Sequence, residues 1–214
     1  MDEEITIIDT KTRNEKIKNF FIDNKRLLIS SSLAILIIII CFFSFQIYKE
    51  NQRVKMSDKY NSAIINYNSI EKSKTINEMR EIIEYKDGTY SPLALYFLID
   101  NNLIKSKEEV NSLFDILIED TPLEKEIKNL IIYKKALYNS DTSNENELLG
   151  ILNPLVNSNS IWKSHSLYLL AEYFYSKNEK QKAKDFFNQI VSTQNANQDI
   201  LLEAKKRLSR DLSD

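Results

Sequence analysis

Apolar positions divide the chain into one uninterrupted apolar run and a longer segment with helical patterning. The run, residues 27–48, contains no Asp, Glu, Lys, Arg or His, and charged sequence lies on both sides of it. As a helix rising ~1.5 Å per residue, it reaches roughly 33 Å, which exceeds the ~30 Å hydrocarbon core of a bilayer. Lipid offers no partners to exposed backbone amides, so only a helix crosses there as a single segment. The pattern predicts a membrane-spanning helix over 27–48.

The features around this run favour an uncleaved anchor over a cleaved signal. The run is longer than the ~7–15-residue core of a secretory signal, and no Ala-x-Ala-like step follows it. Ile40 stands where a lipoprotein signal needs a small residue before Cys41. Six basic residues precede the run and four follow it within a similar distance. Because the more basic flank of a membrane helix tends to stay in the cytoplasm, this difference favours a cytoplasmic N-terminus. We expect a single-pass protein with a cytoplasmic tail over 1–26 and its larger part across the membrane.

After the run, apolar residues recur at helical spacing between short polar connections. Connections of this length predict antiparallel hairpins. No Gly or Pro separates the first of these helices from the membrane run, so we expect the two to be continuous. The predicted helices cover 50–71, 76–85, 92–104, 107–118, 122–139, 143–153, 161–176, 179–193 and 197–210.

Helix starts are indicated by a recurring Ser/Thr-x-x-Glu signature, in which each side chain satisfies a free backbone N–H of the first turn. Two prolines, Pro92 and Pro122, each follow a Ser or Thr and suit the first helical position. The four predicted capping pairs are Thr75 with Glu78, Ser106 with Glu109, Thr121 with Glu124, and Thr142 with Glu145.

Composition narrows the fold class and the chemistry. Two glycines and three prolines in 214 residues, with abundant Leu, Ile, Lys, Glu and Asn, predict an all-α protein. The net charge of −2 gives no basic footprint for nucleic acid. The single cysteine lies in the membrane run, and the single histidine, His165, has no second imidazole or thiol to form a metal or nucleophilic site. We therefore expect no enzyme activity, no metal and no cofactor.

One hairpin, SLYLLAEYFYSKNEKQKAKDFFNQIV from Ser166, resembles the tetratricopeptide (TPR) helix pair. Small residues, Ala171 and Ala183, occupy the places where the two helices approach closely. Asn178 takes the turn position where Gly is commoner, and Asn195 replaces the closing proline. The packing positions predicted for this pair are Leu170, Ala171, Phe174, Ala183 and Phe187.

Weaker copies of the pair precede it at spacings of 38 and 35 residues. The sequence thus predicts a helical arm over 49–72 and a TPR-like α-solenoid of hairpins over 73–214, with a generic helical bundle as the alternative. The final helix is expected to be a solvating cap, with Lys205, Lys206 and Arg207 facing water. The equivalent positions are Ala136, Leu148 and Leu152 in one copy and Leu98, Val110 and Phe114 in the other, with a first pair around Tyr60–Ala63 and Met79–Ile83.

In such a stack the first helices of successive pairs line a concave groove. Rigid amphipathic tyrosines suit contact with a protein partner. The alternative is that these rings are buried between helices. The predicted groove residues are Leu95, Ile99, Tyr133, Leu137, His165, Tyr168, Glu172 and Tyr175.

The order of parts, a charged tail, one membrane helix, an arm and a degenerate TPR stack, resembles the YfgM family of ancillary Sec translocon subunits. The segment NEKIKNFFIDNKRLLI, the motif YSPLA at 90–94, and Trp162 nine residues before Ala171 carry the resemblance. The low-Gly, Asn- and Ile-rich composition departs from better-known members. The resemblance implies a bacterial inner-membrane protein with a periplasmic TPR domain. It also implies partners: translocon subunits, a PpiD-like membrane-anchored chaperone, and exported client polypeptides.

Two alternatives remain open at the sequence level. One is a scaffold for envelope assembly or cell division with no translocon contact. The other is a structural oligomer assembled through the membrane helix, in which Ser30-x-x-x-Ala34 is a small-residue pair at the spacing used for helix packing.

Overall fold

A computed structural model of the chain describes residues 15–67 and 72–213. Across these two ranges the secondary structure is helical, with no strand, which confirms the all-α prediction. The chain separates into two compact units, Met1–Lys55 and Met56–Asp214. Each unit is described by itself below.

The first unit contains a short helix over residues 15–23, a turn at Asn24, and most of α2, Lys25–Ile65. Helix α2 is long and apolar enough to cross a membrane, and its most apolar window is exposed throughout, unlike the core helix of a soluble protein. The predicted continuity between the apolar run and the following helix is confirmed, because α2 has no break before Ile65. The expected extension to residue 71 is not seen at 66–67, and residues 68–71 lie outside the described part.

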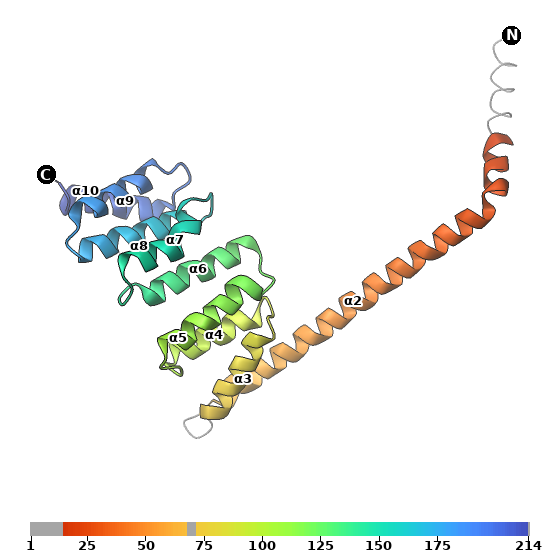
Figure 1. Cartoon of the computed structure of the whole chain (residues 1–214), viewed down its shortest axis with the longest axis horizontal. Coiled ribbons are helices and arrows are strands. Elements are labelled where there is room, and N and C mark those ends of the chain that lie inside the picture. The colour runs from red at the N-terminus through yellow and green to blue at the C-terminus, as the bar shows by residue number, and fades with distance from the viewer. Residues whose placement is uncertain (1–14, 68–71, 214) are drawn as a thin grey trace, which may run out of the picture. The chain divides into compact units, whose positions relative to one another are not determined.

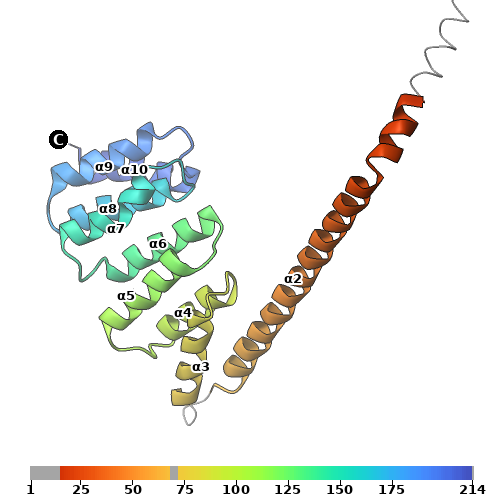
Figure 2. The same cartoon turned by 45° about the vertical axis from the view of Figure 1, so that its right-hand side comes forward.

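The second unit begins with the end of α2 and continues as a series of shorter helices (Figure 1). Successive helices pack against one another, and alternate helices are also neighbours, since α6 contacts α8 and α8 contacts α10. The two views in Figures 1 and 2 agree on this layered order. The helices are α3 Lys72–Glu84, α4 Tyr90–Asp100, α5 Lys107–Asp115, the π-helix η1 Ile116–Asp120, α6 Lys125–Asn139, α7 Glu145–Val156, α8 Lys163–Ser176, α9 Lys180–Ser192 and α10 Gln198–Arg210. The predicted helices from 76–85 onward match these with end differences of up to four residues.

Two clusters of buried apolar residues form the core of the second unit. The N-terminal cluster runs from Ala63 to Ile131 and the C-terminal cluster from Ile132 to Leu212, so the two meet on α6. The five residues expected to pack the best-matching hairpin are all in the C-terminal cluster, each at most 1% exposed: Leu170, Ala171, Phe174, Ala183 and Phe187.

Asparagine in a left-handed conformation ends two of these helices. Asn178, after α8, has φ 62°, and its N–H donates to the Tyr175 carbonyl at 3.0 Å. The Glu179 N–H donates to the Phe174 carbonyl at 2.9 Å, which completes a Schellman motif. Asn102 ends α4 in the same conformation, with φ 51°. The expected turn role of Asn178 is confirmed.

One of the four predicted capping pairs is observed in part: Ser106 caps α5, whereas the Glu109 carboxylate pairs with Arg80 and not with the N-cap backbone. Ser106 Oγ accepts from the Glu109 N–H at 3.1 Å at the start of α5. Helix α7 is capped instead by Asn144, which forms a complete capping box with Glu147, so the prediction of Thr142 was wrong. An asparagine is as good an N-cap as serine or threonine, and here it stands two residues nearer the helix.

The other two predicted caps were also wrong. Thr75 lies inside α3 and is buried. Thr121 follows η1, where its hydroxyl donates to the Ile116 carbonyl at 3.1 Å and therefore serves the end of the preceding helix. Helix α6 begins only at Lys125, so Pro122 is not helical, whereas Pro92 lies in the first turn of α4.

Candidate binding face

The eight predicted groove residues lie on three alternate helices of the second unit. Leu95 and Ile99 are on α4, Tyr133 and Leu137 on α6, and His165, Tyr168, Glu172 and Tyr175 on α8. Leu95 is fully buried in the N-terminal cluster, so it packs between helices and is corrected to a core residue. Leu137 is 50% exposed. We call the remaining seven residues the candidate binding face.

The middle of this face is an aromatic cluster formed across α6 and the start of α8. The Tyr133 ring stacks on Trp162 at 5.6 Å between centroids, and His165 lies 5.9 Å from Tyr133 and 5.1 Å from Trp162. Burial raises the pKa of Tyr133. The Nδ1 atom of His165 is buried and has no hydrogen-bond partner among the described residues. Helix pairing thus brings Tyr133 and His165, two of the predicted groove residues, into contact, and both are half-buried.

A second contact extends the aromatic surface from α6 toward α4. The Lys134 ammonium lies 4.4 Å from the centroid of the Tyr96 ring. Burial raises the pKa of Tyr96 to about 12, and its hydroxyl is buried with no partner among the described residues. Sequence reasoning missed both residues, because neither falls at the register positions used to select groove residues. Ile99, on the same helix, is half-buried.

The end of the face is occupied by Arg207 from α10. Its guanidinium lies 4.3 Å over the Tyr175 ring and donates to both carboxylate oxygens of Glu172, each at 2.8 Å. The Arg207 side chain is only 12% exposed. The expectation that Arg207 would face water was therefore wrong, since the aromatic ring and the carboxylate draw it onto α8.

Tyr168 lies between these two groups of contacts. Its ring meets Phe187 of α9 edge-on at 5.6 Å. Burial raises the pKa of Tyr168 to about 12, and the charge of the Glu172 carboxylate adds to the shift. The tyrosines are thus amphipathic and half-buried: one part of each ring packs between helices while another part remains accessible. Burial between helices thus holds for part of each ring, and contact of these rings with a protein partner stays a prediction.

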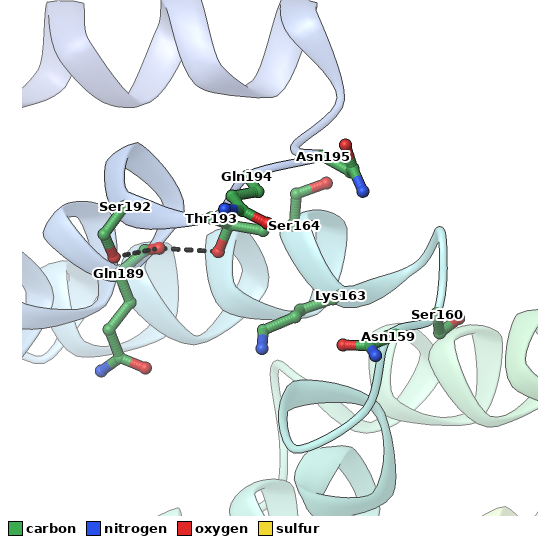
Figure 3. A pocket seen from close by; sticks show the side chains of 9 residues that line it. All are labelled: Asn159, Ser160, Lys163, Ser164, Gln189, Ser192, Thr193, Gln194 and Asn195. Carbon is green, nitrogen blue, oxygen red and sulfur yellow. Dashed lines mark hydrogen bonds between the residues drawn. The ribbon is translucent and has the colours of Figure 1, made fainter.

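None of three cavities found among the described residues of the second unit is lined by the eight predicted residues. The first, about 480 Å³, is polar throughout (Figure 3). Lys163 is its one charged lining residue, and Ser192 and Thr193 donate to the Gln189 carbonyl within it. The second, about 510 Å³, lies among α5, α6 and α7. The third, about 450 Å³, is lined mainly by apolar side chains such as Leu93 and Ile127.

Metal-binding potential is low in the described part of the chain. Within residues 15–67 and 72–213 no group of three or more His, Cys, Asp or Glu side chains could hold a metal ion. Cys41 lies exposed on α2, away from His165 in sequence and in a different unit.

Comparisons of the chain with protein-family models, with curated proteins and with solved structures found no significant match. The class of the protein therefore follows from its own features: the secondary structure of residues 15–67 and 72–213 is helical, and among these residues α2 is long and apolar enough to span a membrane.

Proposed function

We propose that this protein is a non-enzymatic, membrane-anchored scaffold whose second unit is a TPR-like stack that binds other proteins. The observation that carries the proposal is a recurring buried position on alternate helices. Each of these residues is at most 1% exposed, and they are separated by 35, 38, 35 and 33 residues. The residues are Ala63, Leu98, Ala136, Ala171 and Ala204.

Polar contacts between helices recur at nearly the same separation. Glu172 pairs with Arg207, 35 positions later, and Glu145 pairs with Lys182, 37 positions later. Ser160 donates to Glu126, 34 positions earlier, at 2.7 Å. Contacts at one repeat length are what stacked hairpins produce, because each unit touches mainly its neighbours. These contacts support a repeat stack over a generic bundle.

The shape of such a stack suits a scaffold that binds other proteins. Repeat stacks present extended surfaces along one set of helices. Here that set carries half-buried aromatic side chains and the exposed Leu137, which suit protein contact through ring and apolar surface. Tethering through α2 would raise the effective concentration of this surface near membrane-bound partners.

We further propose the partners implied by the family resemblance: subunits of the Sec translocon, a PpiD-like membrane-anchored chaperone, and exported polypeptides. In this proposal α2 crosses a bacterial inner membrane, the N-terminus is cytoplasmic, and the second unit is periplasmic. The support is the order of parts together with the basic residues before the apolar run.

The test is site-specific crosslinking in intact cells with the full-length chain. A photo-reactive residue replaces Leu137 on α6, and a matched control replaces Val191 on α9, which is 39% exposed. We expect translocon subunits or a membrane-anchored chaperone to be captured from position 137 and not from 191. Capture of division or envelope proteins alone would replace the translocon assignment. Equal capture from both positions would contradict the binding face.

A second test measures the loss of partner binding in surface variants. Leu137→Asp places a charge on the exposed face without removing a buried group, and Val191→Asp is its control. We expect only the first to reduce partner recovery. Tyr168 and Tyr175 are less suitable targets, because their rings pack against Phe187 and Arg207, so their replacement would change stability and binding together.

A further inference from the structure

The short helix over residues 15–23 has one apolar side that the chain itself leaves uncovered. Ile17, Phe20 and Phe21 are 49%, 57% and 57% exposed, and none belongs to either core cluster. At about 100° per residue, these three side chains fall within an arc of roughly 100°. A helix with so narrow an apolar stripe needs a partner along that stripe.

The charges of this helix are arranged around the stripe in a particular way. Lys16 and Lys18 each lie about 100° from Ile17, one on either side of the apolar arc. Glu15, Asn19 and Asp23 share the opposite side, and Ile22, which is 60% exposed, lies about 140° from Ile17 at the edge of this polar side. Lysines at the edges of an apolar stripe can extend their heads to phosphate groups while their stems lie along apolar surface. A water-facing acidic side and flanking lysines are the arrangement of helices that lie in a membrane interface.

Asn24 separates this helix from α2. Its backbone N–H and its side-chain amide both donate to the Phe20 carbonyl, at 3.0 and 2.9 Å. A side chain that competes for a helical acceptor commonly ends or bends a helix. Figure 1 shows the chain changing direction here, between the short red helix and the start of α2. Both segments belong to the first unit, so the bend is a property of that unit.

We propose that helix 15–23 lies in the interface of the bilayer that α2 spans, with Ile17, Phe20 and Phe21 at the acyl boundary and Lys16 and Lys18 at lipid phosphates. The lipid surface is the occupant because a single turn residue, Asn24, separates helix 15–23 from α2, the one helix of the described residues that is long and apolar enough to cross a membrane. The inference rests on the proposed membrane anchor. It adds a second attachment that fixes where the tail meets the membrane.

Spin labels on the full-length chain in phosphatidylcholine–phosphatidylglycerol vesicles test this. Native Cys41 is labelled in one sample, and Phe20→Cys and Asn19→Cys are labelled separately in a Cys41→Ala background. Power-saturation measurements then give accessibility to oxygen, which partitions into lipid, and to a water-soluble nickel chelate. We expect a several-fold higher oxygen-to-nickel ratio at position 20 than at its neighbour 19, with the highest ratio at Cys41.

The possible results test the interfacial position of helix 15–23 and the membrane-spanning position of α2 independently. Equal nickel accessibility at 19 and 20, with Cys41 protected, would overturn the interfacial helix and leave the anchor standing. Nickel accessibility at Cys41 would overturn the anchor itself. Spectral broadening at position 20 that disappears on dilution with unlabelled chains would show that a second copy, and not lipid, covers the stripe, which would also overturn the proposal.

Discussion

Replacement of Phe187 by alanine tests the packing of α9 onto the stack. Phe187 is fully buried, meets the Tyr168 ring edge-on at 5.6 Å, and lies 5.9 Å from the Arg207 guanidinium. Removal of its ring leaves a void bounded by α8, α9 and α10. Phe186, its neighbour on the same helix, is only half-buried and stacks on Phe174 at 5.4 Å.

The expected loss follows from burial. A fully buried Phe→Ala change costs about 3–5 kcal/mol, which combines lost transfer free energy with the cavity left behind. The edge-to-face partner accounts for roughly 0.5–1.5 kcal/mol of such a loss beyond area burial. With a urea m-value of about 2 kcal/mol/M, the unfolding midpoint is expected to fall by about 1.5–2.5 M.

Trp162 is the only tryptophan and packs against the C-terminal cluster, so its fluorescence reports unfolding of that cluster. The assay is urea unfolding of the full-length chain in lipid nanodiscs, with Phe186→Ala as the matched control. A larger midpoint loss for Phe186→Ala than for Phe187→Ala would refute the register of α9. A changed m-value would show that the folded or unfolded state itself had altered.

Three further outcomes follow from helix ends. Hydrogen bonding by Arg210 holds the pKa of Asp211 at about 2. The stability that this interaction contributes is therefore present above the ordinary aspartate pKa and is lost as pH falls from about 4 toward 2. Asp211→Asn is expected to flatten this part of the curve of urea-unfolding midpoint against pH. Asn178→Val is expected to cost ~1–3 kcal/mol because of its positive φ, whereas Asn178→Gly stays within ~1 kcal/mol, both measured by urea midpoint. Asn144→Ala is expected to cost ~1 kcal/mol in the same assay, and an unchanged midpoint would contradict its capping role.

The sequence predicted the helical content well because the signals are local. An apolar run without charge and a helical period elsewhere need no tertiary information, and the observed helices follow them closely. Helix starts were harder, because several Ser, Thr and Asn residues near one start compete as caps. At α7 the choice between Thr142 and Asn144 depends on where the preceding turn ends, and pattern alone does not fix that.

The candidate binding face was predicted in part for a different reason. The pattern placed Tyr133 and His165 in one residue set, and the structure brings these two into contact across α6 and α8. The register could not predict how deeply each side chain is buried, so Leu95 was placed at a surface although it is buried. Arg207 was missed because its partners, Glu172 and Tyr175, lie one repeat away in sequence, and a basic residue in a last turn otherwise indicates solvent.

The continuity of α2 joins the apolar run to the last turns of the same helix, which pack in the second unit. Beyond the apolar run the same helix contributes Ala63 to the N-terminal core, and Tyr60 packs against Tyr90 at 5.9 Å. Lys59 pairs with Glu81 on α3. The last turns of α2 thus pack into the second unit, and in the proposed repeat stack Ala63 would stand one repeat before Leu98. A fragment of the protein that starts after Ile65 would expose the face of α3 and α4 that these turns cover. The helix that carries the apolar run therefore also contributes to the core of the second unit, and a boundary drawn at the end of the apolar run would cut through this helix.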